Sequence, residues 1–324
     1  MSALLEVHDL RVSFPDRVAG RIHPVDGVSF DIERGKTLAL VGESGCGKSL
    51  TSLALLRLVP PPGRIDGGSA VSLDGTDVLA LKGDALRQVR GRRIAMIFQD
   101  PMTSLNPVFR IGDQITEVIH AHFDVSRQDA RAQAVALLQE VGIPDPAERL
   151  RAYPHQLSGG MRQRVMIAIA LAGQPELLIA DEPTTALDVT VQAQILELLD
   201  HLRQSRGMAM LLITHDLGIV AGRADHVAVM YAGQIIESAP TAQLFEHPSH
   251  PYTVGLFGSV PRLTGPVERL TPIAGTVPPP NAWPEGCRFR PRCPIKHPKS
   301  ATMPPLLAVG PGHAMRCWLA EDER

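Results

Sequence analysis

The sequence predicts an α/β fold in which a strand, a glycine-rich loop and a helix precede a long helical region. The apolar run Thr37–Val41 leads into the glycine-rich segment 42–49, and leucines at helical spacing continue to Leu58. Helical patterning then dominates residues 113–202, interrupted by an apolar strand at residues 177–180. Further apolar strands are predicted at residues 94–98, 209–213 and His226–Tyr231.

The composition is that of a folded protein without a strong charge bias. Of the 324 residues, 44% are hydrophobic, which is enough to build a substantial core. Lys plus Arg number 32 and Asp plus Glu 34, and the resulting net charge of −2 argues against a nucleic-acid-binding surface. No apolar run reaches the roughly 18–20 residues that cross a bilayer, and the N-terminus lacks a signal-peptide pattern. We therefore expect a chain that begins in the cytoplasm.

The two ends of the chain differ in texture. Apolar and polar residues alternate at residues 5–14 and 28–32 and again around Val71, which predicts antiparallel strands. After about residue 245, prolines become dense and three of the four cysteines occur. We therefore divide the chain into residues 1–245 and 246–324, and call the second part the extension. A loop-rich extension needs a staple or a docking surface to stay ordered.

Residues 42–49, here called the phosphate loop, match the pattern G-x-x-x-x-G-K-[ST] in full. Glycines let successive backbone N–H groups point inward at phosphate oxygens, and the following helix offers its positive N-terminus. Lys48 would reach the β- and γ-phosphates, and the Ser49 hydroxyl would ligate Mg²⁺. Phosphate binding requires only the backbone N–H of Cys46, although its thiol could be reactive beside positive charge. The predicted nucleotide-binding residues here are Gly42, Glu43, Ser44, Gly45, Cys46, Gly47, Lys48 and Ser49.

The strand at residues 177–180 ends in two carboxylates, Asp181 and Glu182. In a fold with a phosphate loop, Asp181 would hold Mg²⁺ through water. Glu182 would point at the γ-phosphate and polarise the attacking water. The acidic pair is common by itself, but its occurrence in one chain with the phosphate loop predicts hydrolysis of a nucleoside triphosphate.

A third motif makes the resemblance to a family specific. The run Leu157-Ser158-Gly159-Gly160-Met161 resembles the LSGGQ signature of ABC ATPases, with Met161 where Gln is usual. The family's other motifs follow in its order: Gln99 resembles the Q-loop glutamine, residues 183–188 the D-loop, and His215 the switch histidine. The resemblance covers about residues 4–245. It implies a RecA-like ABC ATPase core, an antiparallel β subdomain and a helical subdomain at about residues 101–170.

The resemblance also implies roles for the matching residues and two cofactors, ATP and Mg²⁺. The signature residues would form a second anion site at a helix N-terminus, which closes over the ATP held by the phosphate loop of another chain. ATP would thus hold a dimer together, and hydrolysis would release it. The implied roles are general base for Glu182, γ-phosphate contact for His215, Mg²⁺ sensing for Gln99, dimer contacts for Ser158, Gly159, Gly160 and Asp188, and adenine stacking for Phe14.

Three segments narrow the resemblance to importers of dipeptides and oligopeptides. They are residues 99–107 after the Q-loop, residues 247–253 at the start of the extension, and the cysteine-bearing residues 286–294. That group includes carriers of nickel and glutathione, which remain alternatives for the solute. The implied partners are a second, homologous ATPase, two transmembrane permease subunits and an external solute-binding protein, with this chain peripheral on the cytoplasmic face of the membrane.

A soluble ABC ATPase that acts in DNA repair or on ribosomes is the alternative from another class. Such proteins commonly carry a coiled-coil insertion or two ATPase domains in one chain. This sequence has one phosphate loop, no long heptad pattern and a net charge of −2. We therefore expect no nucleic-acid partner.

The cysteines of the extension leave three alternatives open. In relatives that carry four cysteines, this region is similar to a [4Fe–4S] site. In this chain Ser300, seven residues after Cys293, stands where those relatives have one of the four cysteines. Cys287, Cys293 and Cys317 would hold a cluster with Ser300 or His297 as the fourth ligand. They would otherwise hold zinc with one histidine, or remain three reduced structural thiols.

Overall fold

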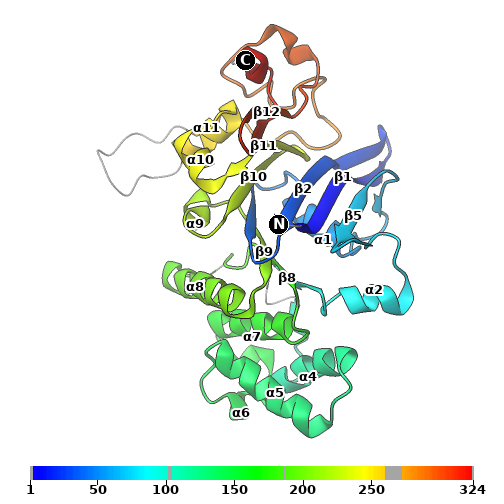
Figure 1. Ribbon diagram of the computed structural model, residues 1–324, viewed down its shortest axis with the longest axis vertical. Helices are drawn as coiled ribbons and strands as arrows, with labels where there is room; N and C mark the ends of the chain where they lie inside the picture. The colour runs from blue at the N-terminus through cyan, green and yellow to red at the C-terminus, as the bar shows by residue number, and fades with distance from the viewer. Residues whose placement is uncertain (1–2, 101–103, 186, 260–271, 323–324) are drawn as a thin grey trace. The chain divides into compact units, whose positions relative to one another are not determined.

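Two units make up the fold in the computed structural model, which describes residues 3–100, 104–185, 187–259 and 272–322 (Figure 1). Among these, unit 1 comprises residues 33–36 and 80–212. Unit 2 comprises residues 3–32, 37–79 and 213–322, and so includes the described part of the extension.

An antiparallel sheet opens unit 2. Its strands follow the order β2-β1-β5-β6, and β4 also pairs with β1. The register places Leu5 opposite Leu73 and Val7 opposite Val71, so the predicted alternation buries one face. The strands are β1 (Ala3–Asp16), β2 (Gly20–Glu33), β4 (Arg64–Ile65), β5 (Ala70–Leu73) and β6 (Thr76–Asp77).

A second group of strands in unit 2 carries the phosphate loop. Strand β3 (Thr37–Val41) is buried throughout and pairs in parallel with β10 (His226–Tyr231), as apolar strands in a parallel sheet do. The order continues from β10 through β11 (Gln234–Pro240) and β13 (His313–Met315) to β12 (Leu307–Gly310). Two strands of the extension therefore lengthen this sheet, and the pairing of β13 with β11 gives the extension its docking edge.

Helix α1 (Lys48–Leu55) follows the phosphate loop and ends earlier than its leucine pattern predicts. Arg57 adopts a φ of 53°, and the N–H of Leu58 bonds to the carbonyl of Leu53 at 2.8 Å. This closing turn satisfies a carbonyl at the helix end. Leu58 consequently lies outside the helix.

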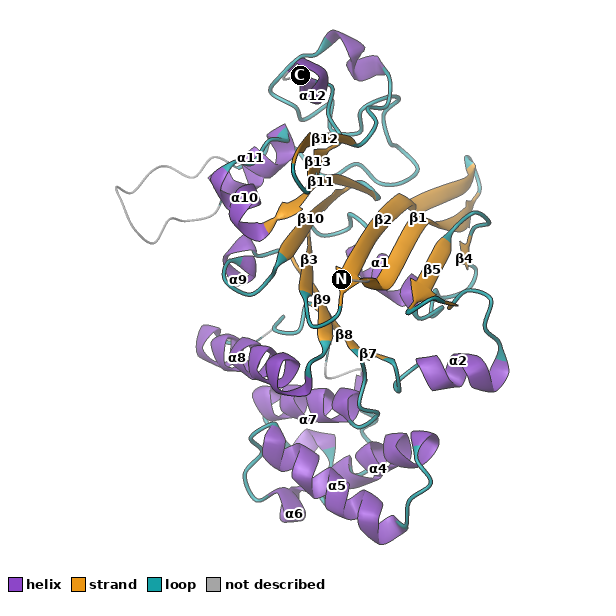
Figure 2. Ribbon diagram, viewed as in Figure 1, coloured by secondary structure: helices purple, strands orange, loops and turns teal. Residues whose placement is uncertain are grey.

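Unit 1 is mainly helical (Figure 2). Buried isoleucines recur at Ile111, Ile115 and Ile119, which turns one face of α4 toward its neighbours α5 and α7. Strands β7 (Ile94–Ile97) and β8 (Leu177–Asp181) pair in parallel, as the apolar runs predict. The helices are α2 (Gly83–Val89), α4 (Ile111–His122), α5 (Arg127–Glu140), α6 (Pro146–Arg149), α7 (Gly159–Leu171) and α8 (Val189–Arg206), with a 3₁₀ turn at Pro154–Gln156. Helix α2 has no counterpart among the predicted elements.

The remaining elements belong wholly or partly to unit 2. Strand β9 (Ala209–Thr214) starts within unit 1 and ends within unit 2. The short helices of unit 2 are α9 (Leu217–Val220), α10 (Thr241–Glu246), α11 (Pro251–Gly258) and α12 (Leu319–Asp322), with a 3₁₀ turn at Pro298–Ala301. Within the described ranges, no helix has the length and apolar character needed to cross a bilayer.

A buried polar cluster fastens the extension to β11. The carboxylate of Glu237, fully buried, accepts hydrogen bonds from the N–H groups of Ser249 at 2.7 Å and His250 at 2.9 Å. It also accepts one from Nε2 of His313 at 2.8 Å. The Nδ1 atom of His250 accepts from the N–H of Tyr252 at 3.0 Å and so caps α11. Burial lowers the pKa of His250 to about 3.

This pKa predicts an acid-sensitive fold. In the unfolded chain His250 takes up a proton near pH 6.5, whereas in the folded chain it stays neutral down to about pH 3. The contribution of neutral His250 to the free energy of unfolding is therefore fully present above pH 6.5 and declines as the pH falls from there to about 3. His250→Asn keeps an acceptor at the cap and removes the titrating ring. Between pH 7.5 and 5.0, wild type should lose about 2 kcal/mol more stability than the variant.

Urea unfolding of both proteins at the two pH values measures this difference. Equal losses in wild type and His250→Asn would assign the acid sensitivity to other groups.

Candidate functional site

The phosphate loop lies against main chain from two other segments of unit 2. A Cβ atom on Gly42 would stand 2.2 Å from the carbonyl oxygen of Met230, and one on Gly47 would stand 2.6 Å from that of Pro24. Gly47 also has a φ of 109°, which side chains rarely adopt. The glycines at these two positions are thus required by close packing as well as by the curl of the loop.

Lys48 and Cys46 occupy the interior of the loop. The Lys48 side chain is buried, and its Nζ donates to the carbonyl oxygens of Gly42 at 2.7 Å and Glu43 at 3.0 Å. Cys46 is 1% exposed, and burial raises the pKa of its thiol. The structure therefore argues against a reactive thiol at this position, because the thiol stays protonated. Ser44 and Gly45 are exposed, whereas Ser49 is half-buried in the first turn of α1.

Unit 1 brings Gln99 and Glu182 together. Oε2 of Glu182 accepts hydrogen bonds from Nε2 of Gln99 at 3.1 Å and from Oγ1 of Thr185 at 3.0 Å. Glu182 has a φ of 46°, a strained conformation that is concentrated at functional sites. Its neighbour Asp181 ends β8 and is 3% exposed. The carboxylate of Glu182, on a strained backbone, is thus fixed by two hydrogen bonds, and it directly follows the buried carboxylate of Asp181.

Thr185 is a site residue that the sequence reasoning missed. Its N–H bonds to the carbonyl of Glu182 at 3.2 Å, which forms a turn and returns its hydroxyl to the carboxylate. The signal was a hydroxyl three residues after Glu182, a spacing typical of such turns. The next residue of the D-loop, Ala186, lies outside the described residues.

The signature lies at the start of α7 in unit 1. Ser158 is the N-cap, and its hydroxyl accepts from the N–H of Met161 at 3.3 Å. A Cβ on Gly160 would stand 2.8 Å from Cγ1 of Val191, so glycine allows α7 and α8 to approach closely. Asp188 caps α8 by accepting from the N–H of Val191 at 3.0 Å. Ser158, Gly159 and Asp188 are exposed, so a binding partner can reach them.

Two predicted residues of unit 2 have contrasting surroundings. His215 is exposed directly after β9, where Asp216 caps the short helix α9. Phe14 is half-buried near the end of β1, and a Cβ on Gly63 would stand 2.5 Å from its Cζ atom. The ring therefore packs on Gly63. Adenine stacking by Phe14 stays a prediction.

The predicted metal site of the extension is not supported. Among the residues that the structure describes, no group of three or more His, Cys, Asp or Glu side chains is placed to hold a metal. Cys287 and Cys293 pack against the apolar core, and burial raises the pKa of Cys287 and Cys317. Nδ1 of His297 accepts from the N–H of Lys299 at 3.2 Å, which engages that nitrogen in a 3₁₀ cap.

Ser300 also serves the backbone of the extension. Its carbonyl oxygen accepts from the N–H of Cys287 at 3.0 Å. Ligation requires deprotonated thiolates, whereas burial favours the protonated form of Cys287 and Cys317. The described residues therefore support neither the cluster nor the zinc site.

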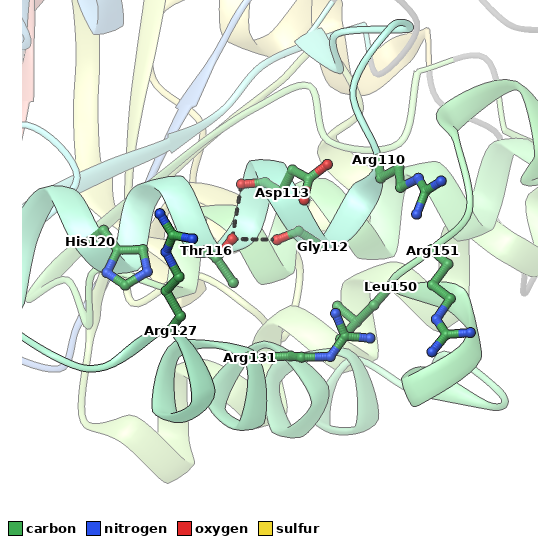
Figure 3. Close-up of a pocket in the computed structure, with 9 residues that line it drawn as sticks. All are labelled: Arg110, Gly112, Asp113, Thr116, His120, Arg127, Arg131, Leu150 and Arg151. Atoms are coloured by element: carbon green, nitrogen blue, oxygen red, sulfur yellow. Dashed lines mark hydrogen bonds between the residues drawn. The ribbon is translucent and has the colours of Figure 1, made fainter.

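A basic cavity of about 420 Å³ lies in unit 1 between α4, α5 and the segment that follows α6 (Figure 3). Arginines dominate its polar lining, and Asp113 is its one carboxylate. The hydroxyl of Thr116 donates to the carbonyl oxygen of Gly112 and is thereby engaged within α4. The lining residues are Arg110, Gly112, Asp113, Thr116, His120, Arg127, Arg131, Leu150 and Arg151.

Comparison with known proteins gives matches over the whole chain. Residues 25–185 match the family model described as ABC transporter, and residues 236–299 match that of the oligopeptide/dipeptide transporter C-terminal region. The oligopeptide transport ATP-binding protein AppD of Bacillus subtilis is 51% identical over 100% of this chain and 98% of its own length. The probable D,D-dipeptide transport ATP-binding protein DdpD of Escherichia coli is 48% identical over 99% and 98%.

Solved structures agree with these sequence matches. The ATP-binding cassette MJ0796, in a dimeric post-hydrolysis state bound to ADP and Pi, superimposes with a TM-score of 0.64 at 25% identity. That match covers 73% of this chain and 98% of the cassette. The cbiO1 protein of Clostridium perfringens, part of the ABC transporter complex cbiONQ, gives a TM-score of 0.64 over 79% and 96%.

The packing of the phosphate loop predicts unequal costs for two similar substitutions. Gly45 and Gly47 both have positive φ, but a Cβ on Gly45 meets nothing within 4 Å. Gly45→Ala should therefore cost only backbone strain, about 1 kcal/mol. Gly47→Ala adds overlap with a backbone carbonyl and should cost about 2 kcal/mol more. Urea unfolding of the two variants measures the difference, and equal destabilisation would contradict the close approach to Pro24.

Proposed function

The chain belongs to the ABC transporter family and is an ATPase of that family, and we propose that it powers the import of dipeptides or oligopeptides. The observation that carries this proposal is the match over the full length, extension included. The relative AppD, an oligopeptide transport protein, aligns with all of this chain. The family model for the oligopeptide/dipeptide transporter C-terminal region covers residues 236–299, outside the part that matches the general ABC transporter model.

The residues that match the motifs of the family receive proposed roles in this chain. Lys48 binds phosphate oxygens of ATP, and its burial within the phosphate loop supports this role. Ser49 and Asp181 offer a hydroxyl and a carboxylate, the oxygen ligands that Mg²⁺ prefers. Mg²⁺, when bound, neutralises charge that develops on the phosphates.

Glu182 takes a proton from the attacking water, and Gln99 and Thr185 hold its carboxylate in place. His215 contacts the γ-phosphate.

Two copies of the ATPase fold form the working state in this proposal. The exposed N-terminus of α7, with the Ser158 hydroxyl, closes over ATP held by the phosphate loop of the partner ATPase. The dimeric cassette MJ0796 supports such pairing in the family. The partner is a second, homologous subunit, and dissociation after hydrolysis drives the transport step.

The permease contact is assigned to the helical part of unit 1. Large apolar side chains are exposed beside the Q-loop, with Phe98 39%, Val108 71% and Phe109 53% exposed. In this proposal the three side chains form part of one apolar docking surface, because contiguous exposed apolar patches mark interaction sites. Docking there would hold the chain at the cytoplasmic face of the membrane, where two permease subunits move the solute that an external binding protein delivers.

Replacement of the proposed base gives the first test. Glu182→Gln should lower ATP hydrolysis by two to four orders of magnitude, because the amide cannot accept the proton of the attacking water. ATP binding should persist, and ATP-bound dimers should accumulate. Steady-state hydrolysis and gel filtration with ATP measure these effects. Glu197→Gln, at an exposed position on α8, is the matched control and should hydrolyse ATP at the wild-type rate. Retained turnover in Glu182→Gln would sink the assignment of the base.

Solute uptake tests the transport proposal. Cells in which Lys48→Ala replaces the wild-type chain should take up a labelled tripeptide at less than about a tenth of the normal rate, because the chain no longer binds ATP. Uptake of labelled nickel and glutathione is measured in parallel. Loss of nickel or glutathione uptake, with peptide uptake intact, would reassign the solute.

A further inference from the structure

The extension contacts the phosphate loop directly, within unit 2, through Glu43. Both guanidinium Nη atoms of Arg292 donate to the Glu43 carboxylate, at 2.9 Å to Oε1 and 3.1 Å to Oε2. The hydroxyl of Tyr252 accepts a hydrogen bond from the backbone N–H of Glu43 at 3.0 Å. Tyr252 lies 209 positions and Arg292 lies 249 positions after Glu43 in the sequence. Glu43 is therefore bound by the extension through its side chain and its backbone.

Arg292 is held rigidly in this position. Its side chain is 5% exposed, and Nε donates to the carbonyl of Ala274 at 2.9 Å. Nη2 also donates to the carbonyl of Gly275 at 3.2 Å, and the guanidinium lies 5.7 Å from the ring centroid of Tyr231. A planar cation with several fixed partners orients a carboxylate precisely. Arg292 is thus preorganised by the extension for one partner.

Aromatic packing fixes Tyr252 in the same way. Its ring centroid lies 4.7 Å from that of Tyr231 and 5.5 Å from that of Phe289, and the residue is fully buried. Burial raises the pKa of Tyr252, so its hydroxyl stays protonated. Tyr231 ends β10 beside the loop, and Phe289 belongs to the extension. The Tyr252 hydroxyl, which accepts from the Glu43 N–H, is therefore held in place by rings from both β10 and the extension.

Glu43 links these contacts to the phosphate-binding lysine. Its carbonyl oxygen accepts from Nζ of Lys48 at 3.0 Å. Its N–H, carbonyl and carboxylate are thus all engaged, the first and last by the extension and the carbonyl by Lys48. The carboxylate also places a negative charge within a loop that binds triphosphate. That charge would repel the phosphates if it were not paired.

We propose that Arg292 and Tyr252 are positioning residues through which the extension sets the affinity of the phosphate loop for ATP. Arg292 neutralises and orients Glu43, and Tyr252 fixes the backbone of the same residue. The proposal rests on the assignment of residues 42–49 as the ATP site, and goes beyond it by giving the extension a role in nucleotide binding.

Charge removal on both sides of the ion pair tests the proposal. Arg292→Met leaves the Glu43 charge unpaired beside the phosphates, so the Kd and KM for ATP should rise about tenfold. Hydrolysis at saturating ATP should change by less than about twofold. The double variant Glu43→Gln/Arg292→Met removes the repelling charge and should return the Kd to within about threefold of wild type. A purely structural role of Arg292 predicts no such recovery.

A second variant tests the backbone contact. Tyr252→Phe removes the acceptor of the Glu43 N–H and leaves that donor without its partner. The Kd for ATP should rise about fivefold. This effect should persist in a Glu43→Gln background, because the backbone contact does not depend on the carboxylate.

The control breaks another ion pair of the extension. Lys299 and Glu321 form a salt bridge in which both side chains are exposed, at 57% and 37%. Lys299→Met should leave the Kd for ATP unchanged, since exposed pairs of this kind contribute little. Binding is measured on the purified full-length chain with a fluorescent ATP analogue, and urea midpoints verify folding. If Arg292→Met does not fold, Arg292→Lys replaces it and should show a smaller shift in the same direction.

The outcomes separate this inference from the proposed function. Wild-type affinity in the folded Arg292 variant, or no recovery in the double variant, would overturn the role of Arg292. Equal ATP affinity of wild type and Lys48→Ala would instead show that residues 42–49 are not the ATP site. The first result leaves the ATPase assignment intact, and the second removes it.

Discussion

The architecture of unit 2 depends on how closely the phosphate loop approaches the end of β10. No side chain fits at Gly42, because a Cβ there would overlap the carbonyl of Met230. This approach fixes where the loop begins and places its lysine beside its own carbonyls. The next residue of β10, Tyr231, packs on Tyr252 and Phe289 of the extension. The same strand end therefore positions both the loop and the segment that contacts it.

Local patterns made most of the fold predictable from sequence. Apolar runs such as Thr37–Val41 became buried parallel strands, because such strands are covered on both faces. The phosphate loop at residues 42–49 was predictable from its glycine pattern. The structure shows that Gly42 and Gly47 are needed for close packing against main-chain carbonyls as well as for phosphate binding. The early end of α1 was not predictable, since its apolar pattern continues to Leu58 after Arg57 has already turned the chain.

Contacts between distant residues were beyond prediction from patterns. The hydrogen bond from Gln99 to Glu182 was not predicted: the resemblance to ABC ATPases gave each residue a role, but neither the roles nor the spacing indicated that the two side chains meet. Thr185 was missed because its hydroxyl acts through a turn. The metal site at the cysteines was one of three alternatives that the resemblance to relatives with four cysteines left open, and no group of ligands is placed to hold a metal among the described residues. Spacing in the sequence does not determine whether side chains converge.

A buried arginine, Arg288, helps to hold the proline-rich extension in place. Arg288 pairs with Asp26 and donates to the carbonyl of Ala232 at 2.6 Å, while its guanidinium lies 3.5 Å from the ring of Trp283. Those partners belong to strands and turns rather than to the phosphate loop. Arg288 thus acts as an anchor, and it leaves Arg292, four residues later, to contact Glu43. Because anchoring and loop contact use different arginines, ATP affinity can change without release of the extension.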